Sequence, residues 1–221
     1  MMLQSIISSL NSHKIVLASG SPRRKTILQN HVGMVFDVVP STFEENIDKS
    51  LPPIEYVRET AKQKALEVAQ RLCIGDGSPD LIISADTVVK QDNMIFEKPK
   101  DRQDAFNMIM RFSDRKHSVC TGVTLVCPVN STAFTGSKVE GYENLLMTQF
   151  HESTDVMMAK LTPEIVNAYI DTGECMDKAG GYGIQAIGAS LVEGIYGDYY
   201  NVMGFPLHRF CKELLEIYNK K

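Results

Sequence analysis

A run of residues near the start of the chain has the types and spacing needed to hold an anion. Ser19-Gly20-Ser21-Pro22-Arg23-Arg24 follows a short apolar run at residues 14–18 and opens the helix expected over residues 22–30. Ser21 suits the N-cap and Pro22 the first turn, and a helix start offers unpaired N–H groups to phosphate. Two guanidiniums add bidentate donors. The same residues also fit a well-capped helix with solvated arginines, and the segment alone leaves both interpretations open.

A carboxylate also stands inside an otherwise apolar strand pattern. Asp86 directly follows Ile82-Ile83-Ser84-Ala85, and Thr87-Val88-Val89 continues the β pattern. Because an unpaired buried charge is costly, such a carboxylate is usually a metal ligand, a general base or half of an ion pair. If the strand ended at Ala85, Asp86 would only begin a turn. The continuing β pattern favours the functional interpretation.

Charged side chains on other segments match the needs of a metal-bound triphosphate. Glu44-Glu45 and Asp198 are expected in loops, and hard oxygen ligands from separate loops suit Mg²⁺ or Mn²⁺ bridging phosphates. Lys64 lies next to the apolar face of the helix expected over residues 53–72, and Lys98 lies in a proline-stiffened loop. Both lysines are candidate phosphate partners. Each of these residues also has a simpler explanation, because most loop acids and most lysines are solvated.

A glycine-dense segment ends on a polar amide. Asp177-Lys178-Ala179-Gly180-Gly181-Tyr182-Gly183-Ile184-Gln185 places Gln185 where its amide can both donate to and accept from the edge of a base. Glycines permit close approach of the backbone to a ligand. Taken alone, the segment is better explained as a plain glycine loop.

Composition excludes several other classes of protein. The 221 residues carry a net charge of −4, without the basic surplus of a general nucleic-acid binder. Neither His-Glu-x-x-His nor Gly-x-Ser-x-Gly occurs, so zinc hydrolases and serine esterases lack their signatures. The five scattered cysteines (Cys73, Cys120, Cys127, Cys175 and Cys211) form no Cys-x-x-Cys pair, which favours a reducing compartment. No apolar segment is long enough to span a bilayer, and we expect a cytoplasmic protein without a nucleic-acid or membrane partner.

The pattern of elements predicts a mixed α/β fold around these residues. Helices are expected over residues 53–72, 102–112 and 206–218, and a further helix starts at Thr162-Pro163. Strands are expected over residues 35–39, 81–89, 117–127, 150–160 and 189–193. Several strand pairs are joined by loops too short for a crossover helix, which favours a mixed sheet. Residues 1–12 are interpreted as an N-terminal arm or short helix, and residues 13–221 as a single domain with two lobes across a cleft.

In their order and spacing, these segments resemble the Maf-like family of nucleotide pyrophosphatases. The resemblance runs from Ile15 to about Tyr218. It rests on the following motifs: Leu17-Ala18-Ser19-Gly20-Ser21-Pro22-Arg23-Arg24, Ala61-Lys62-Gln63-Lys64-Ala65, Ala85-Asp86-Thr87, Glu97-Lys98-Pro99, His117-Ser118-Val119, and Met176 followed by the glycine-dense segment to Gln185. Any one of these motifs is weak, but the full set is specific.

The resemblance implies roles for particular residues. The Asp of the Ala-Asp-Thr motif is the catalytic proton acceptor of the family, which is Asp86 here. Three family positions track base preference and match the branch acting on dTTP and UTP rather than on 7-methyl-GTP: Arg23, Thr87 and Gln185. Further residues fall on family active-site positions: Ser19, Glu45, Lys64 and Lys98. Asp198 falls on a less constant position.

The resemblance also implies an inosine-triphosphatase-like fold with a twisted mixed sheet, flanking helices and a deep cleft. A divalent cation, Mg²⁺ or Mn²⁺, is expected on Glu45 and Asp86, and a homodimer is common in the family. We expect Arg23, Arg24, Lys64 and Lys98 to neutralise the triphosphate while water attacks the α-phosphorus and pyrophosphate leaves. CTP and modified pyrimidine nucleotides are further expected substrates.

Two other functions stay open at this point. One is a 7-methyl-GTP pyrophosphatase, and the other is a nucleotide-binding regulator of cell division with little turnover. A pure binder need not keep a candidate base such as Asp86. Sequence also leaves open whether Asp86 is a base, a metal ligand or both.

Overall fold

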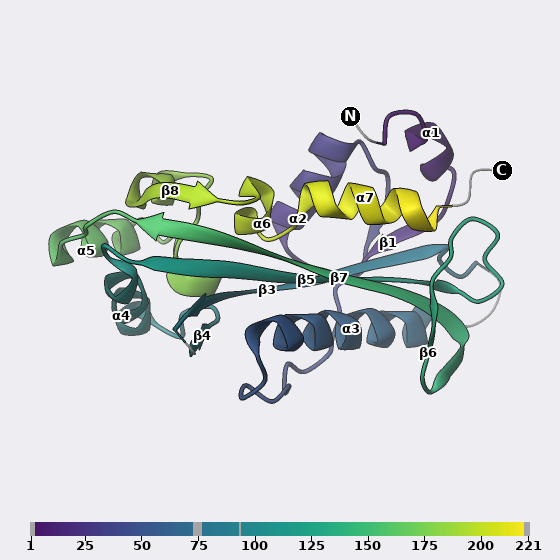
Figure 1. The fold of residues 1–221 in the computed structure, drawn as a ribbon, viewed down its shortest axis with the longest axis horizontal. Helices are drawn as coiled ribbons and strands as arrows, with labels where there is room; N and C mark the ends of the chain where they lie inside the picture. Colours follow the sequence, from purple (N-terminus) through teal and green to yellow (C-terminus); the bar gives the residue numbers. More distant parts are fainter. Residues whose placement is uncertain (1–2, 73–76, 93, 219–221) are drawn as a thin grey trace.

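One mixed β-sheet forms the centre of the computed structural model, which describes residues 3–72, 77–92 and 94–218 (Figure 1). In the described residues the strand order is β2-β1-β3-β5-β7-β6, with β4 beside β3 and β8 beside β7. Strand β1 runs parallel to β2 and β3, and the other pairs are antiparallel. The predicted mixed sheet is therefore confirmed. The strands are β1 (Ile15–Leu17), β2 (Asp37–Val38), β3 (Leu81–Gln91), β4 (Met94–Phe96), β5 (Lys116–Pro128), β6 (Ser137–Val139), β7 (Tyr142–Met158) and β8 (Val192–Tyr196).

Helices cover both faces of the long strands. Figure 1 shows α3 on one side of β3, β5 and β7, with α1, α2 and α7 on the other side and α4 and α5 at one end. The helices are α1 (Ile7–Leu10), α2 (Pro22–Thr26), α3 (Pro53–Leu72), α4 (Arg102–Phe112), α5 (Pro163–Asp171), α6 (Tyr199–Met203) and α7 (Leu207–Ile217). Helices α3 and α4 have the predicted bounds. In the described part of the chain, no helix is long and apolar enough to cross a membrane.

Strand β3 presents successive side chains to the two layers of helices. Ile83 and Ala85 belong to the core cluster on the α7 side, and Val88 packs with residues of α3. Because side chains alternate along a strand, Asp86 faces α3 while its neighbour Thr87 faces α2 and α6. The two residues of the Ala-Asp-Thr motif thus lie on opposite faces of the sheet.

The edge of β3 is open beside this motif. Strand β1 ends at Leu17, whose partner on β3 is Ile83, and β4 pairs with β3 only from Val89 onward. Between these points no described strand borders β3 on this side. The segment following β1 and the segment following β4 therefore both reach β3 at residues 84–88.

A glycine lets α3 approach the sheet at the same level. Gly122 on β5 pairs with Asp86, and a Cβ added there would lie 2.5 Å from the carbonyl oxygen of Val57 in α3. This contact is with backbone, so the helix itself would have to move. The close approach is what brings Lys64 of α3 down to the sheet.

Replacing Gly122 by Ala is therefore expected to lower the free energy of unfolding by about 2 kcal/mol or more, because the added methyl group overpacks the helix against the strand. Chemical denaturation measures this change. Gly194→Ala is the matched control, since an added Cβ there meets nothing within 4 Å. Equal stability of the two variants would contradict the prediction.

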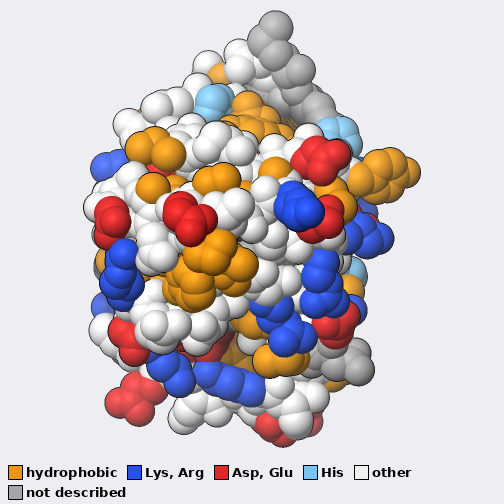
Figure 2. All heavy atoms as spheres, turned by 90° about the vertical axis from the view of Figure 1, so that its left-hand side faces the viewer, with side chains coloured by type: hydrophobic (Ala, Val, Ile, Leu, Met, Phe, Trp, Pro, Cys, Tyr) orange, Lys and Arg blue, Asp and Glu red, His pale blue; other side chains and the backbone are white. Residues whose placement is uncertain are grey.

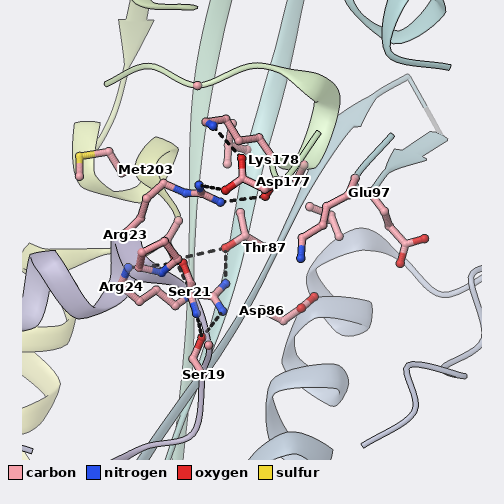
Figure 3. Close-up of a pocket in the computed structure, with 18 of the residues that line it drawn as sticks. Ser19, Ser21, Arg23, Arg24, Asp86, Thr87, Glu97, Asp177, Lys178 and Met203 are labelled. Carbon is pink, nitrogen blue, oxygen red and sulfur yellow. Dashed lines mark hydrogen bonds and ion pairs between the residues drawn. The ribbon is translucent and has the colours of Figure 1, made fainter. Parts of the chain in front are cut away.

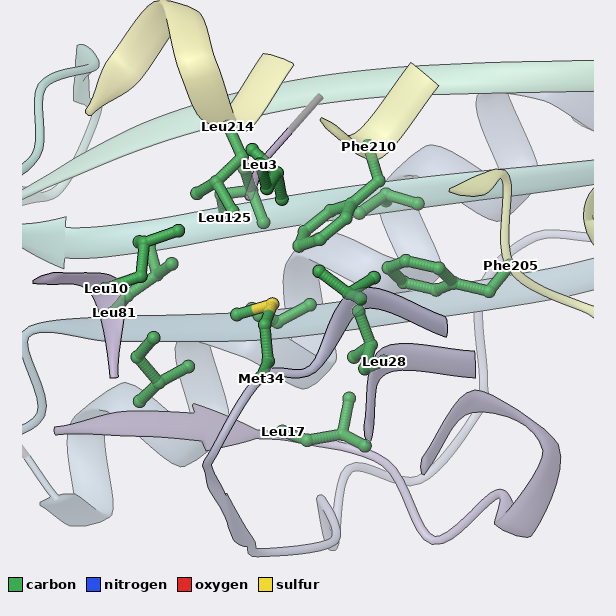
Figure 4. Close-up of a cluster of buried hydrophobic side chains, with 14 of the residues drawn as sticks. Leu3, Leu10, Leu17, Leu28, Met34, Leu81, Leu125, Phe205, Phe210 and Leu214 are labelled. Atoms are coloured by element: carbon green, nitrogen blue, oxygen red, sulfur yellow. The ribbon is translucent and has the colours of Figure 1, made fainter. Parts of the chain in front are cut away.

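The N-terminal segment is part of the core. Leu3 and Leu10 are buried in the same cluster as Leu125, Phe210 and Leu214, and Figure 4 shows Leu3 beside Leu214 of α7 and Leu10 beside Leu81 of β3. The short helix expected within residues 1–12 is present as α1, and it packs into the body of the protein rather than standing apart.

Several predicted elements differ in the structure. The helix expected over residues 22–30 is α-helical only to Thr26 and continues as a π-helical turn, η1 (Ile27–Val32). The strand expected over residues 35–39 shrinks to β2. Strand β7 begins well before residue 150 and forms a hairpin with β6. The sequence did not indicate this first part of β7, because its residues are half-exposed and carry a weak apolar pattern. The strand expected over residues 189–193 is mostly a 3₁₀ turn, η3 (Ile187–Leu191), and β8 follows it.

Candidate active site

A cavity of about 720 Å³ lies over the open edge of β3, between two clusters of buried apolar side chains. It is the structural counterpart of the cleft expected between two lobes. Nine of the residues predicted for the site from the sequence line it, and Asp198 does not: Ser19, Arg23, Arg24, Glu45, Lys64, Asp86, Thr87, Lys98 and Gln185. Their individual roles stay predictions, but the fold does bring them together from six separate segments of the chain.

Asp86 is a buried carboxylate with a charged partner. Its side chain is 10% exposed, and its Oδ1 lies 2.8 Å from Nζ of Lys64. The same ammonium lies 2.7 Å from Oε1 of Glu45. Lys64 therefore compensates the buried charge of Asp86 and draws two carboxylates from different elements toward one point in the cavity. Both of these carboxylates were expected to bind metal.

Arg24 braces the cavity wall. Its guanidinium donates to the carbonyl oxygens of Ala85 (2.8 Å) and Gly204 (2.9 Å) and to the hydroxyls of Ser19 (3.1 Å) and Thr87 (3.0 Å). These contacts leave one of its five N–H groups free. Burial lowers the pKa of Arg24, and the nearby Asp86 carboxylate opposes that shift. Its predicted contact with phosphate stays a prediction, since most of its N–H donors already form hydrogen bonds with other residues of the protein.

Arg23 reaches across the cavity to the glycine-dense segment. Its guanidinium donates to the carboxylate of Asp177 (2.6 Å) and to the carbonyl of the same residue (2.9 Å). Partial burial acts to raise the pKa of Asp177, but hydrogen bonds from Lys178 and Arg23 outweigh it and hold the pKa at about 2. Figure 3 shows this pair closing one side of the cavity, with Arg24 and Thr87 on one side of β3 and Asp86 on the other.

Lys98 has no ion-pair partner among the residues that the structure describes. It is exposed and makes no hydrogen bond or ion pair with the described part of the chain. Its neighbour Glu97 is engaged: the carboxylate accepts from the hydroxyl of Tyr56 (2.9 Å) and pairs with Lys49, and the carbonyl accepts from the N–H of Gly180 (3.0 Å). Glu97 thereby anchors the glycine-dense segment, while Lys98 is left available to an anion.

Asp198 does not join the site. Its Oδ1 accepts from the N–H of Tyr200 (2.8 Å), which makes it the N-cap of α6, and its backbone is bonded to the hydroxyl of Thr154. It lies outside the residues lining the cavity. The structure thus shows Asp198 as the cap of α6, because an Asp before a helix satisfies unpaired N–H groups at the helix start, and its proposed place near a metal stays a prediction.

The donor set is compatible with a divalent cation. Within residues 3–72, 77–92 and 94–218, no three His, Cys, Asp or Glu side chains form a complete metal site. Mg²⁺, however, is usually held by one or two carboxylates together with phosphate oxygens of the substrate. Glu45 and Asp86 already share one ammonium partner, so this point of the cavity accommodates positive charge.

Four further residues line the cavity without a role predicted from the sequence: Asp177, Lys178, Tyr182 and Glu97. Asp177, Lys178 and Tyr182 lie inside the glycine-dense motif, and this motif was the sequence signal that could have identified them. Tyr182 lies over the buried His117, with 2.6 Å between its hydroxyl and Nε2 of the imidazole, and burial lowers the pKa of His117 to about 4. His117 is therefore neutral near pH 7 and belongs to the floor beneath the cavity.

The protein's surface charge is mixed. Figure 2, which views the end of the molecule near α5, shows acidic and basic side chains interspersed. Neither sign of charge dominates this face, so it creates no single-sign field.

Comparison with known proteins places these features in context. Residues 14–217 match the family model described as Maf-like protein. The chain is 48% identical over 222 residues to the human "Probable bifunctional dTTP/UTP pyrophosphatase/methyltransferase protein", covering 99% of this chain and 34% of that protein. It thus spans about a third of the length of this relative.

Two bacterial relatives match over nearly their whole length. The "dTTP/UTP pyrophosphatase" of Clostridium perfringens is 43% identical, with 91% of this chain and 95% of that protein covered. The protein of the same name from Agathobacter rectalis is 42% identical, with 92% and 97% covered. Among solved structures, a HAM1 protein from Coxiella burnetii has a TM-score of 0.49 and 14% identity over 92% of this chain and 99% of that chain.

Proposed function

The chain belongs to the Maf-like family, and on that premise we propose that it hydrolyses dTTP and UTP to the monophosphate and pyrophosphate. One observation carries the proposal: the buried Asp86 faces Lys64 and Glu45 in a cavity lined by every residue expected to bind a triphosphate. The names of relatives at 42–48% identity support the choice of substrate. CTP and modified pyrimidine nucleotides are included in the proposed range.

The triphosphate is proposed to lie among the cations of the cavity. Lys98 is available without breaking any contact, and Arg23 and Lys64 exchange their carboxylate partners for phosphate oxygens. Asp86 accepts a proton from the attacking water as the water oxygen bonds to the α-phosphorus. The bond between the α-phosphorus and the α–β bridging oxygen breaks, and pyrophosphate leaves. The positive charges of Lys98, Arg23 and Lys64, held in place around the phosphates, supply much of the rate acceleration.

A divalent cation, Mg²⁺ or Mn²⁺, is proposed on Glu45 and Asp86. Such a cation would neutralise phosphate charge and polarise the phosphoryl oxygens. The protein's part is to hold two carboxylates at the wall of the cavity, with Lys64 between them.

Base selection is proposed to involve Gln185, Thr87 and Arg23. Gln185 is exposed at the cavity wall, and its amide makes no hydrogen bond to the described residues, so it is free to pair with a pyrimidine. The Thr87 hydroxyl is already engaged by Arg24 and lies 3.0 Å from that of Thr121. Thr87 is therefore proposed to shape the wall of the cavity against the base, and Gln185 to form hydrogen bonds with the base.

A cytoplasmic location and a homodimer also belong to the proposal. Every cysteine that the structure describes is a free thiol, which suits a reducing compartment; Cys73 lies outside the described residues. The homodimer is carried over from the family resemblance.

The test is pyrophosphate release from a panel of triphosphates with Mg²⁺ or Mn²⁺. The panel holds dTTP, UTP, CTP, ATP, GTP and 7-methyl-GTP, and α,β-methylene-UTP is the control for the bond that breaks. We expect monophosphate and pyrophosphate from dTTP and UTP, and no product from the methylene analogue. Preference for 7-methyl-GTP would move the protein to the other branch of the family. Tight nucleotide binding without turnover would contradict an enzyme.

A further inference from the structure

Glu174 lies at the base of the segment that presents Gln185 and contacts both ends of it. Its carboxylate accepts from the N–H groups of Ile187 (3.1 Å) and Gly188 (3.3 Å), the first two residues of η3. Its carbonyl oxygen accepts from Nζ of Lys178 at the start of the segment. Glu174 thus satisfies N–H groups that a helix start leaves unpaired and ties residues 174–188 into a closed loop.

A second contact fixes the middle of this loop. The hydroxyl of Tyr169, a buried residue of α5, donates to Glu174 (3.2 Å) and accepts from the N–H of Gly183 (3.1 Å). The two sides of the loop also pack backbone against backbone, because a Cβ on Gly188 would lie 2.5 Å from the carbonyl oxygen of Gly183. Side chain and backbone together hold the loop in one shape.

Gln185 sits between the anchored positions. The backbone is held at Gly183 on one side and at Ile187 on the other, so only three residues span the gap. Gln185 is the polar side chain of that span and lines the cavity, whereas Glu174 does not line it. The position of the amide therefore depends on Glu174 although Glu174 cannot touch a nucleotide in the cavity.

We propose that Glu174 is a positioning residue for base recognition, which fixes the place of Gln185 by holding η3 and Tyr169. This inference rests on the proposed function, because it assigns the loop to selection among nucleotides. It predicts that loss of Glu174 weakens recognition of the base while leaving hydrolysis of the bound triphosphate intact.

The test compares Glu174→Gln with Gln185→Ala, the double variant and Glu193→Gln. The amide of Gln has an NH₂ group in place of one of the two carboxylate oxygens. Glu174→Gln therefore breaks at least one of the hydrogen bonds that the carboxylate accepts, while the side-chain volume stays nearly constant. We expect KM for UTP to rise about tenfold and kcat to change by less than about threefold. Glu193 is an exposed residue of β8 without a hydrogen bond or ion pair to the described residues, and Glu193→Gln should match the wild type.

The double variant decides whether the two residues act together. If Glu174 acts through Gln185, the double variant has the same KM for UTP as Gln185→Ala, because the two losses are not independent. Losses that multiply, or a fall in kcat with KM unchanged, would overturn the inference. If Glu174→Gln fails to fold, Tyr169→Phe removes only the hydroxyl contact to the same loop and is judged by the same criteria.

Hydrogen exchange tests the loop without relying on activity. The amides of Gly183, Ile187 and Gly188 should exchange faster in Glu174→Gln than in the wild type, while amides of β5 keep their protection. Unchanged exchange at these three amides would overturn the inference even in an active enzyme. Absence of turnover in the wild type would instead contradict the proposed function, so the two failures are distinguishable.

Discussion

Replacing Asp86 by Asn is expected to lower kcat for UTP and dTTP on the order of 10³-fold, the usual contribution of a general base. Asn keeps the shape of the side chain and can still accept a hydrogen bond from Lys64, which lies 2.8 Å from the carboxylate. It cannot accept the proton of the attacking water, and it removes a negative charge that the proposed divalent cation would bind. Steady-state pyrophosphate release measures the effect, and nucleotide binding shows whether the cavity is intact.

Asp37→Asn is the matched control, because Asp37 is exposed on β2 and has no partner in the described part of the chain. It should retain wild-type turnover. An Asp86→Asn enzyme within tenfold of the wild type would show that the water is activated elsewhere. Loss of nucleotide binding together with turnover would assign Asp86 to the binding of substrate or metal rather than to proton transfer.

Replacing Arg24 by Lys should also be damaging, although the charge is kept. A guanidinium spans several acceptors in one plane, whereas an ammonium is a compact point charge. The carbonyl oxygens of Ala85 and Gly204 lie on different segments, and each accepts from a different nitrogen of Arg24. A single ammonium cannot reproduce this geometry, so at least one of the two carbonyls loses a strong donor; Gly204 would keep only the longer bond from the hydroxyl of Thr87 (3.3 Å). We expect a loss of about 2–3 kcal/mol in stability and roughly a 100-fold loss in kcat/KM.

Thermal or chemical denaturation and the same pyrophosphate assay check both parts. Arg115→Lys is the control, since Arg115 is an exposed arginine whose ion pair is with Asp92 at the surface, where such pairs contribute little. If Arg24→Lys were as stable and active as this control, Arg24 would be a phosphate ligand at most and not a brace of the cavity wall.

Local sequence patterns predicted the elements with a sustained apolar pattern well, and the short or half-exposed ones poorly. Helix α3 has its predicted bounds because its apolar residues recur over twenty residues, and Asp86 stood out because it breaks an apolar strand pattern. The first half of β7 was missed because it is half-exposed, and η3 was taken for a strand because its five residues are too few to show a period.

The contacts that complete the site join residues far apart in the chain. Arg23 and Asp177 are 154 residues apart, and Arg24 reaches Gly204 across 180 residues. No local pattern contains such pairs. The family resemblance identified the residues around the cavity, but it did not indicate that Arg24 points into the protein, that Asp177 holds Arg23, or that Glu174 anchors the loop of Gln185.

The opposite orientation of Asp86 and Thr87 on β3 also bears on how such a protein changes over evolutionary time. The sheet itself separates the residue that faces Lys64 from the residue that faces α2 and α6. Substitutions on the Thr87 side that spare Arg24, which also holds the Ala85 carbonyl, leave the carboxylate on the other face in place. If Asp86 and Thr87 have the roles proposed above, a gene lineage can alter which nucleotide it accepts while inheriting the bond-breaking step unchanged. The loss of a single codon from this strand would instead shift both residues to the opposite faces at once.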